Sequence, residues 1–214
     1  MRASLTMIRL LSGLIALGLC FDAPAYVVTI SPGVRAVYLR VGTGTSVTYN
    51  SNVTTFGNNG NANNNTINIV SVVVPANVVG NGANRAMTSN SSQGTSSLDS
   101  YAFCDVPAEI YIGGFYRLPG NSGTATLTAT VPTSLTNSSG QTIPFSQISW
   151  TSSGNGDTGA QPILAGTFTP GSQTLASFPV NTWRESCHSF AYGNDAVVAA
   201  GTFTGQVTYT LSAP

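Results

Sequence analysis

The residues that decide the expected fold read G-T-F-T-G-Q-V-T-Y-T-L and occupy positions 201–211. One face of this stretch carries Phe203, Gly205, Val207, Tyr209 and Leu211. The opposite face carries only threonines and a glutamine. Strict alternation of this kind is typical of a β-strand with one face in a core. β-Branched and aromatic residues fill the stretch and no proline interrupts it, so we expect a long central strand.

The rest of the chain repeats the pattern in shorter pieces, separated by turn-forming glycine, proline, asparagine and serine. No convincing amphipathic helix interrupts the series, so we expect one all-β domain, a sandwich or a barrel. Two stretches rich in asparagine, at residues 50–66 and 77–100, are expected loops. Gly113 and Gly114 suggest a bulge or bend. The other expected strands cover residues 26–30, 34–41, 46–49, 66–74, 101–104, 108–118, 123–131, 143–150, 163–169, 174–178, 182–192 and 196–200.

Charge is scarce in this sequence. Of 214 residues only 7 % are charged, the net charge is zero, and all seven basic residues are arginine. An apolar content of 42 % argues against disorder. Nucleic-acid binding would need a basic stripe, which scattered arginines and seven acids do not supply.

The N-terminus has the pattern of an export signal. Arg2 and Arg9 precede or begin an apolar run over residues 10–19, and Ala23-Pro24-Ala25 fits a signal-peptidase site. We expect residues 1–25 to be removed, which leaves a mature domain at residues 26–214. The apolar run is too short for a comfortable membrane span, and no later stretch is long enough for one.

Cys104 and Cys187 remain after the signal is cleaved. Two cysteines in an exported chain are most simply one disulfide. The alternative is a reactive Cys187 next to His188, but neighbours on a strand point to opposite faces, which gives a poor dyad.

No catalytic pattern stands out. The chain has one histidine, lacks G-x-S-x-G, and disperses its acids. G-N-G-D-T-G at residues 154–159 formally matches a dinucleotide-binding pattern, but no helix is expected to follow it. We therefore expect no enzyme, no metal site and no cofactor. Several aromatic residues could form either a sugar-stacking platform or part of the core: Tyr111, Phe115, Tyr116, Trp150 and Trp183.

The expected strand at residues 182–192 places Trp183, Glu185 and Cys187 on one face. A tryptophan beside a cystine on an inner face is typical of β-sandwich cores. An inward carboxylate needs a partner, and we expect an arginine to supply it for Glu185.

The closing stretch resembles the C-terminal strand of bacterial fimbrial subunits of the chaperone–usher type. The export signal, the low-charge Thr/Asn/Gly-rich composition, the expected disulfide and the all-β pattern agree with this resemblance. It implies an immunoglobulin-like β-sandwich that lacks its last strand and is completed by strand donation. A periplasmic chaperone, an outer-membrane usher and like subunits would be the partners.

In this interpretation the chaperone reads the closing strand, and the N-terminal extension of the next subunit later takes the chaperone's place. The donor segment would be residues 26–33, with Tyr26, Val28 and Ile30 as its apolar face. The protein would pass through the periplasm and end in a surface fibre. Two alternatives stay open, namely an exported binding module that recognises glycans, and a hydrolase that depends on His188.

Overall fold

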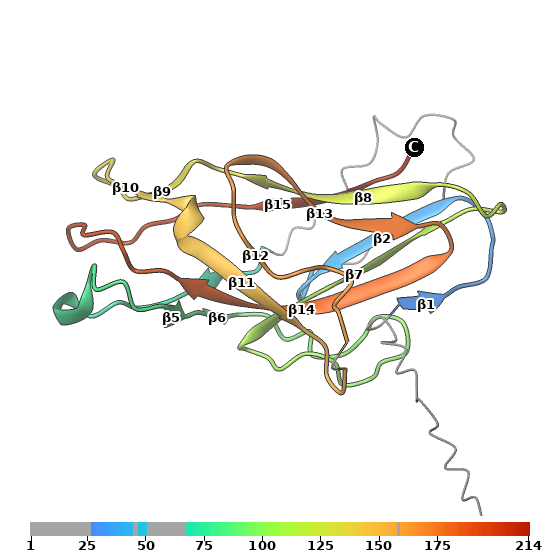
Figure 1. The fold of residues 1–214 in the computed structure, drawn as a ribbon, viewed down its shortest axis with the longest axis horizontal. Coiled ribbons are helices and arrows are strands. Elements are labelled where there is room, and N and C mark those ends of the chain that lie inside the picture. Colours follow the sequence, from blue (N-terminus) through green and yellow to red (C-terminus); the bar gives the residue numbers. More distant parts are fainter. Residues whose placement is uncertain (1–26, 45–46, 51–66, 158) are drawn as a thin grey trace, which may run out of the picture.

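The computed structural model describes residues 27–44, 47–50, 67–157 and 159–214 (Figure 1). In this part of the chain the regular elements are antiparallel strands and two short 3-10 helices, so the all-β prediction is confirmed. The first strands are β1 (Val27–Thr29), β2 (Ala36–Val41), β3 (Val47–Asn50), β4 (Val70–Ser71), β5 (Arg85–Ala86) and β6 (Thr88–Ser89). They are followed by β7 (Glu109–Arg117), β8 (Thr124–Val131), β9 (Ser134–Thr136), β10 (Thr142–Pro144), β11 (Ile148–Ser153) and β12 (Gly166–Thr167). The last strands are β13 (Gly171–Pro179), β14 (Thr182–Tyr192) and β15 (Thr208–Ser212), and the 3-10 helices are η1 (Ala76–Val78) and η2 (Phe145–Gln147).

The largest sheet has the order β12-β11-β14-β7-β2-β3, and β1 and β5 also pair with β14. The eleven residues of β14 therefore contact four strands. Its first half lies between β7 and β1, and its second half lies between β11 and β5. The alternation predicted for residues 182–192 is thus confirmed, and this strand holds the central position.

A smaller sheet of order β13-β8-β15 packs against the large one (Figure 1). Strand β8 alternates as predicted, with threonines outward and fully or nearly fully buried side chains inward. These inward residues join one hydrophobic core with the inward residues of β7 and β2. The inward residues of the three strands are Ala125, Leu127, Ala129, Val131, Ile110, Ile112, Tyr116 and Val37.

The opposite face of β14 is not part of that main core. Cys187 and Tyr111 pack there with Phe103 and Cys104, which belong to the segment that leads into β7. The predicted disulfide between Cys104 and Cys187 is present, with a Cα–Cα distance of 5.6 Å. The shared face of Trp183, Glu185 and Cys187 is confirmed, but a loop covers it, so the prediction of a place in a sandwich core was wrong.

The closing stretch differs from the prediction of a long central strand. Strand β15 has five residues and lies at the edge of the three-stranded sheet. Upstream of it, Thr204 makes only an isolated bridge to Thr136. At Gly205 the ring of Phe145 approaches so closely that an added Cβ would lie 2.6 Å from it. The bridge at Thr204 and the contact at Gly205 hold this part of the tail against β9 and η2. It therefore does not extend the hydrogen-bonded pairing of β15 with β8.

Other differences concern local breaks in the strands. The predicted bulge at Gly113 and Gly114 was wrong, because β7 keeps its register with β2 and β14 through both residues. An added Cβ at Gly114 would collide with the carbonyl oxygen of Tyr38, so the glycine permits close strand approach. The register shift lies instead in β13, between Thr174 and Ala176. The expected strand at residues 143–150 is split by η2.

The arginines that the structure describes are all half-buried, and they lie in strands or directly beside one. These residues are Arg35, Arg40, Arg85, Arg117 and Arg184. In Arg35, Arg85 and Arg184 the guanidinium Nε is itself buried.

We predict that replacing both cysteines, Cys104→Ala with Cys187→Ala, lowers the free energy of unfolding by about 4 kcal/mol, because the disulfide closes a loop with a sequence separation of 83 residues. Guanidinium unfolding of the mature chain in non-reducing buffer measures this loss. The wild-type chain in reducing buffer is the control and should behave like the variant. A loss below about 1 kcal/mol would contradict the role assigned to the disulfide.

Candidate functional site

Strand β15 presents an open edge. It pairs with β8 from Thr208 to Ser212, and among the described residues no strand pairs with its second edge. Its inward side chains, Tyr209 and Leu211, are half-buried and pack on the main core. Upstream, Phe203 and Val207 also contact that core, whereas Gly205 is exposed. The structure therefore brings four of the five predicted interaction residues to one side of the core.

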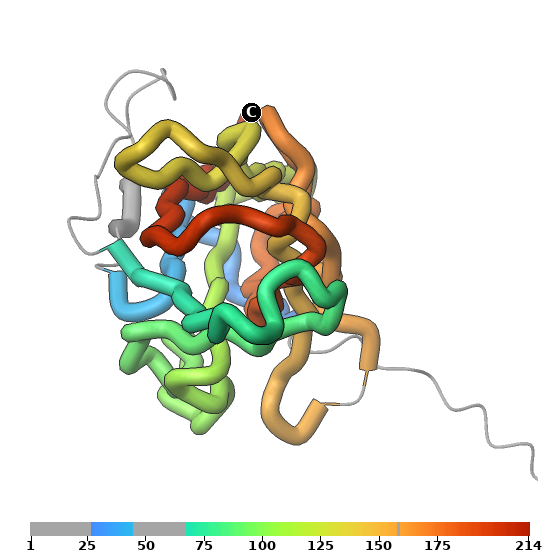
Figure 2. The backbone as a smooth tube through the Cα atoms, turned by 90° about the vertical axis from the view of Figure 1, so that its left-hand side faces the viewer, coloured from blue at the N-terminus to red at the C-terminus, as the bar shows by residue number. Residues whose placement is uncertain are grey.

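A second extended segment, residues 67–75, borders the same core. Val70, Val72 and Val74 are half-buried against it, while Val73 on the opposite side is 88 % exposed. Only Val70–Ser71 belongs to a strand, which pairs with β6. In Figure 2 this segment (teal) and the closing tail (red) cross the same side of the molecule. On this side the core is bordered by half-buried apolar side chains.

The predicted donor segment lies at an edge of the large sheet. Tyr26 falls outside the described residues. Val28 pairs with Trp183 of the same chain, and the Ile30 N–H donates to the carbonyl of Asn181 over 2.9 Å. The pairing covers only three residues, and Val28 remains 39 % exposed. The signal peptide predicted for residues 1–25 also lies outside the described part.

Glu185 is fully buried, and its hydrogen-bond partners are not arginines. Its Oε2 accepts hydrogen bonds from the Tyr111 hydroxyl (2.5 Å), the Trp183 indole N–H (2.7 Å) and the Ser96 hydroxyl (3.0 Å). The prediction of an arginine partner was therefore wrong, because three neutral donors from β7, β14 and the covering loop bind Oε2, while Oε1 is buried with no hydrogen-bond partner among the described residues. Burial raises the pKa of Glu185, and the three hydrogen bonds oppose that shift.

This arrangement positions the loop around Ser96. The Ser97 N–H donates to the Tyr111 oxygen over 3.1 Å, and Tyr111 in turn donates to Glu185. The Glu109 carboxylate lies near the sulfurs of Cys104 and Cys187. Both sulfurs are joined in the disulfide, so they offer no thiolate to a metal ion.

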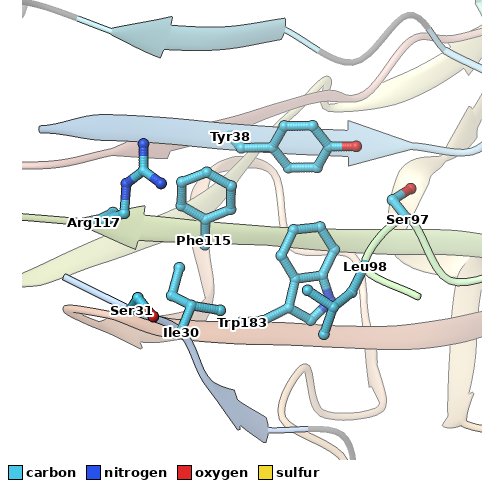
Figure 3. Close-up of a pocket in the computed structure, with 8 residues that line it drawn as sticks. All are labelled: Ile30, Ser31, Tyr38, Ser97, Leu98, Phe115, Arg117 and Trp183. Atoms are coloured by element: carbon cyan, nitrogen blue, oxygen red, sulfur yellow. The ribbon is translucent and has the colours of Figure 1, made fainter. Parts of the chain in front are cut away.

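Beside this loop the outer face of the large sheet has an open hollow of about 340 Å³ (Figure 3). Its lining comes from β2, β7, β14, the end of the β1 segment and the covering loop. The lining residues are Ile30, Ser31, Tyr38, Ser97, Leu98, Phe115, Arg117 and Trp183.

Of the five aromatic residues considered from the sequence, Phe115 and Trp183 line this hollow. Trp183 is nevertheless buried, as are Tyr111, Tyr116 and Trp150, which leaves Phe115 as the half-buried member of the set. Sequence reasoning did not single out Tyr38 or Arg117. Both residues lie in strands that the sequence predicted, Tyr38 in β2 and Arg117 in β7. The side-chain alternation of a strand could therefore have placed both on the outward face.

His188 is fully buried, and its ring stacks on Trp150 with centroids 5.7 Å apart. Neither ring nitrogen has a hydrogen-bond partner among the described residues. Burial lowers the pKa of His188 to about 4, because a charged imidazolium would lose its hydration there.

We predict that His188 makes the fold sensitive to acid. As pH falls from about 6.5 to about 4, His188 is protonated in the unfolded chain but stays neutral in the folded chain. The free energy of unfolding therefore falls with pH, by up to about 3 kcal/mol. In His188→Phe the loss due to His188 should be absent, while the aromatic packing on Trp150 is kept; Glu185, whose pKa is raised, contributes equally to both proteins. Unfolding free energies of both proteins across this pH range give the comparison. Identical pH profiles for the two would show that His188 is not the titrating group.

In the described part of the chain no helix has the length and apolar character needed to cross a bilayer. No family model, curated protein or solved structure matches this chain. Its function must therefore be argued from the geometry of its own residues.

Proposed function

We propose that this chain is an exported structural subunit of a bacterial surface fibre and that subunits join by β-strand exchange. The observation that carries the proposal is the edge of β15 with which no strand of the described residues pairs, together with half-buried apolar side chains on its inward face. An unpaired strand edge above an incompletely covered core is a template for another strand.

The energetics favour such an addition. A strand laid between the closing tail and residues 67–75 would hydrogen-bond to the free backbone edge and cover Val70, Val72 and Val207. Full burial of an apolar side chain contributes roughly 1.5–3 kcal/mol, so several contacts give a stable joint. The fold would then be an immunoglobulin-like sandwich that gains its last strand from a partner. Before assembly a periplasmic chaperone would protect the same edge, and an outer-membrane usher would receive the complex.

The N-terminal segment is the donor in this proposal. Its pairing with β14 is short and partly exposed, so little is lost when it leaves for a neighbouring subunit. The Cys104–Cys187 disulfide fits folding in an oxidising compartment such as the periplasm, and the fibre would stand on the cell surface.

We predict that deleting residues 26–31 from the mature chain gives soluble monomers that form no fibres, because the donor strand is gone. Electron microscopy and size-exclusion chromatography measure the outcome. Val34→Ser is the matched control, since Val34 is 55 % exposed and follows the donor segment. Unaltered fibres after the deletion would overturn strand exchange through this segment.

We also predict an effect of Leu211→Ala in the mature chain that lacks residues 26–31. The substitution should weaken the binding of a synthetic peptide of residues 26–33 to this shortened chain by about tenfold. The estimate corresponds to about 1.4 kcal/mol of lost apolar contact on the inward face of β15. Thr210→Ala changes the neighbouring outward residue and should leave the dissociation constant unchanged. Titration calorimetry provides both constants. Equal effects from the two substitutions would speak against β15 as the acceptor edge.

A further inference from the structure

We propose that the hollow on the outer face of the large sheet binds a single sugar ring that carries a carboxylate, such as a uronic or sialic acid residue. This face lies on the other side of the sheet from the main core, away from the edge of β15. Ile30 and Ser31 in the lining belong to the segment proposed as the donor strand, so the inference concerns the free subunit, in which that segment pairs with β14.

The floor of the hollow is aromatic. Figure 3 shows Tyr38, Phe115 and Trp183 next to one another over β2, β7 and β14. The Tyr38 and Phe115 rings are parallel within 1°, with centroids 5.5 Å apart, and Trp183 lies 5.8 Å from Phe115. Phe115 is half-buried, so part of its ring faces the opening. Trp183 is tilted by 38° against Phe115 and, like Tyr38, is buried, so the exposed part of Phe115 is the surface that suits the C–H face of a sugar ring.

Arg117 contributes one positive charge to the lining of the hollow. The Arg117 guanidinium carbon lies 5.7 Å from the centroid of Phe115. Its Nε–H donates to the Val34 carbonyl over 3.2 Å, which fixes the direction of the guanidinium group. No other lining residue carries a charge, so no acid competes for the arginine within the hollow. Charge complementarity therefore selects an anion, and a planar guanidinium pairs best with a carboxylate or another planar oxyanion.

The rim supplies polar partners for hydroxyl groups. Ser31, Ser97 and Tyr38 bring three hydroxyls to the lining. The loop that carries Ser97 is held by its N–H bond to Tyr111 and by the Arg40 guanidinium, which donates to the Ser97 hydroxyl over 3.4 Å. A rim fixed in this way is preformed, which lowers the entropic cost of binding.

Size and chemistry together identify the ligand class. The volume of about 340 Å³ lies at the lower end of the roughly 300–1,000 Å³ seen for small-molecule sites. The hollow therefore suits one ring rather than a longer oligosaccharide. A ring with a carboxylate for Arg117, hydroxyls for the rim and an apolar face for Phe115 uses all three features. A purely aromatic carboxylate would leave the hydroxyl rim without partners.

The experiment titrates the mature chain with glucuronic acid, galacturonic acid and N-acetylneuraminic acid, and with neutral glucose and galactose. Calorimetry reports binding, and tryptophan fluorescence of a Trp150→Phe variant, in which Trp183 is the remaining tryptophan, reports it at the hollow. We expect at least one acidic sugar to bind about tenfold or more tightly than the neutral sugars. We also expect Arg117→Gln to abolish that preference and Phe115→Ala to weaken binding about tenfold. Raising the salt concentration should weaken binding of the acidic sugar alone.

Two substitutions remote from the hollow provide matched controls. Arg85→Gln removes another half-buried arginine, and Leu164→Ala removes an exposed apolar side chain. Both should bind the acidic sugar as the wild type does, and thermal melts show that every variant is folded. The proposal is overturned if no acidic sugar binds the wild-type chain, if neutral and acidic sugars bind equally, or if benzoate binds as tightly as the best sugar. It is also overturned if Arg117→Gln retains the preference for the acidic sugar.

Discussion

Strand β14 is the constraint on which the rest of this structure depends. Its two halves have different neighbours, so one eleven-residue strand connects β7 and β1 to β11 and β5. Both of its faces are covered, one by the main core and the other by the loop held by the Cys104–Cys187 disulfide. A strand with two covered faces and two occupied edges has little freedom, and the surrounding strands take their positions from it.

The buried acid in this strand organises polar contacts in a molecule with few charges. Three neutral donors converge on one oxygen of Glu185, and they come from β7, from β14 itself and from the covering loop. The same set of bonds places Ser97 and Trp183 in the wall of the outer hollow. A fully buried carboxyl group thus holds residues that line a surface hollow.

The sequence could predict the faces of strands better than their neighbours. Alternation identified β8, because period-two burial follows directly from backbone geometry. The extent of β14 was predicted too, although both of its faces are covered. Alternation could not show that β15 is an edge strand, because position within a sheet is set by long-range pairing that no local pattern encodes. The contact of Gly205 with Phe145 is likewise tertiary. The cysteine pair was predictable from its number and from the export signal, whereas the neutral donors around Glu185 come from segments distant in sequence.

The placement of the arginines has a consequence for resistance to proteolysis. The chain contains no lysine, so a trypsin-like protease can cut only after arginine. Every arginine in the described part of the chain is half-buried within or beside a strand, where the backbone is not free to enter a protease cleft. Residues 118–183 contain no arginine, and of the two asparagine-rich stretches one has none (50–66) and the other has only Arg85 (77–100). The fold therefore makes this chain resistant to proteases that cleave after arginine.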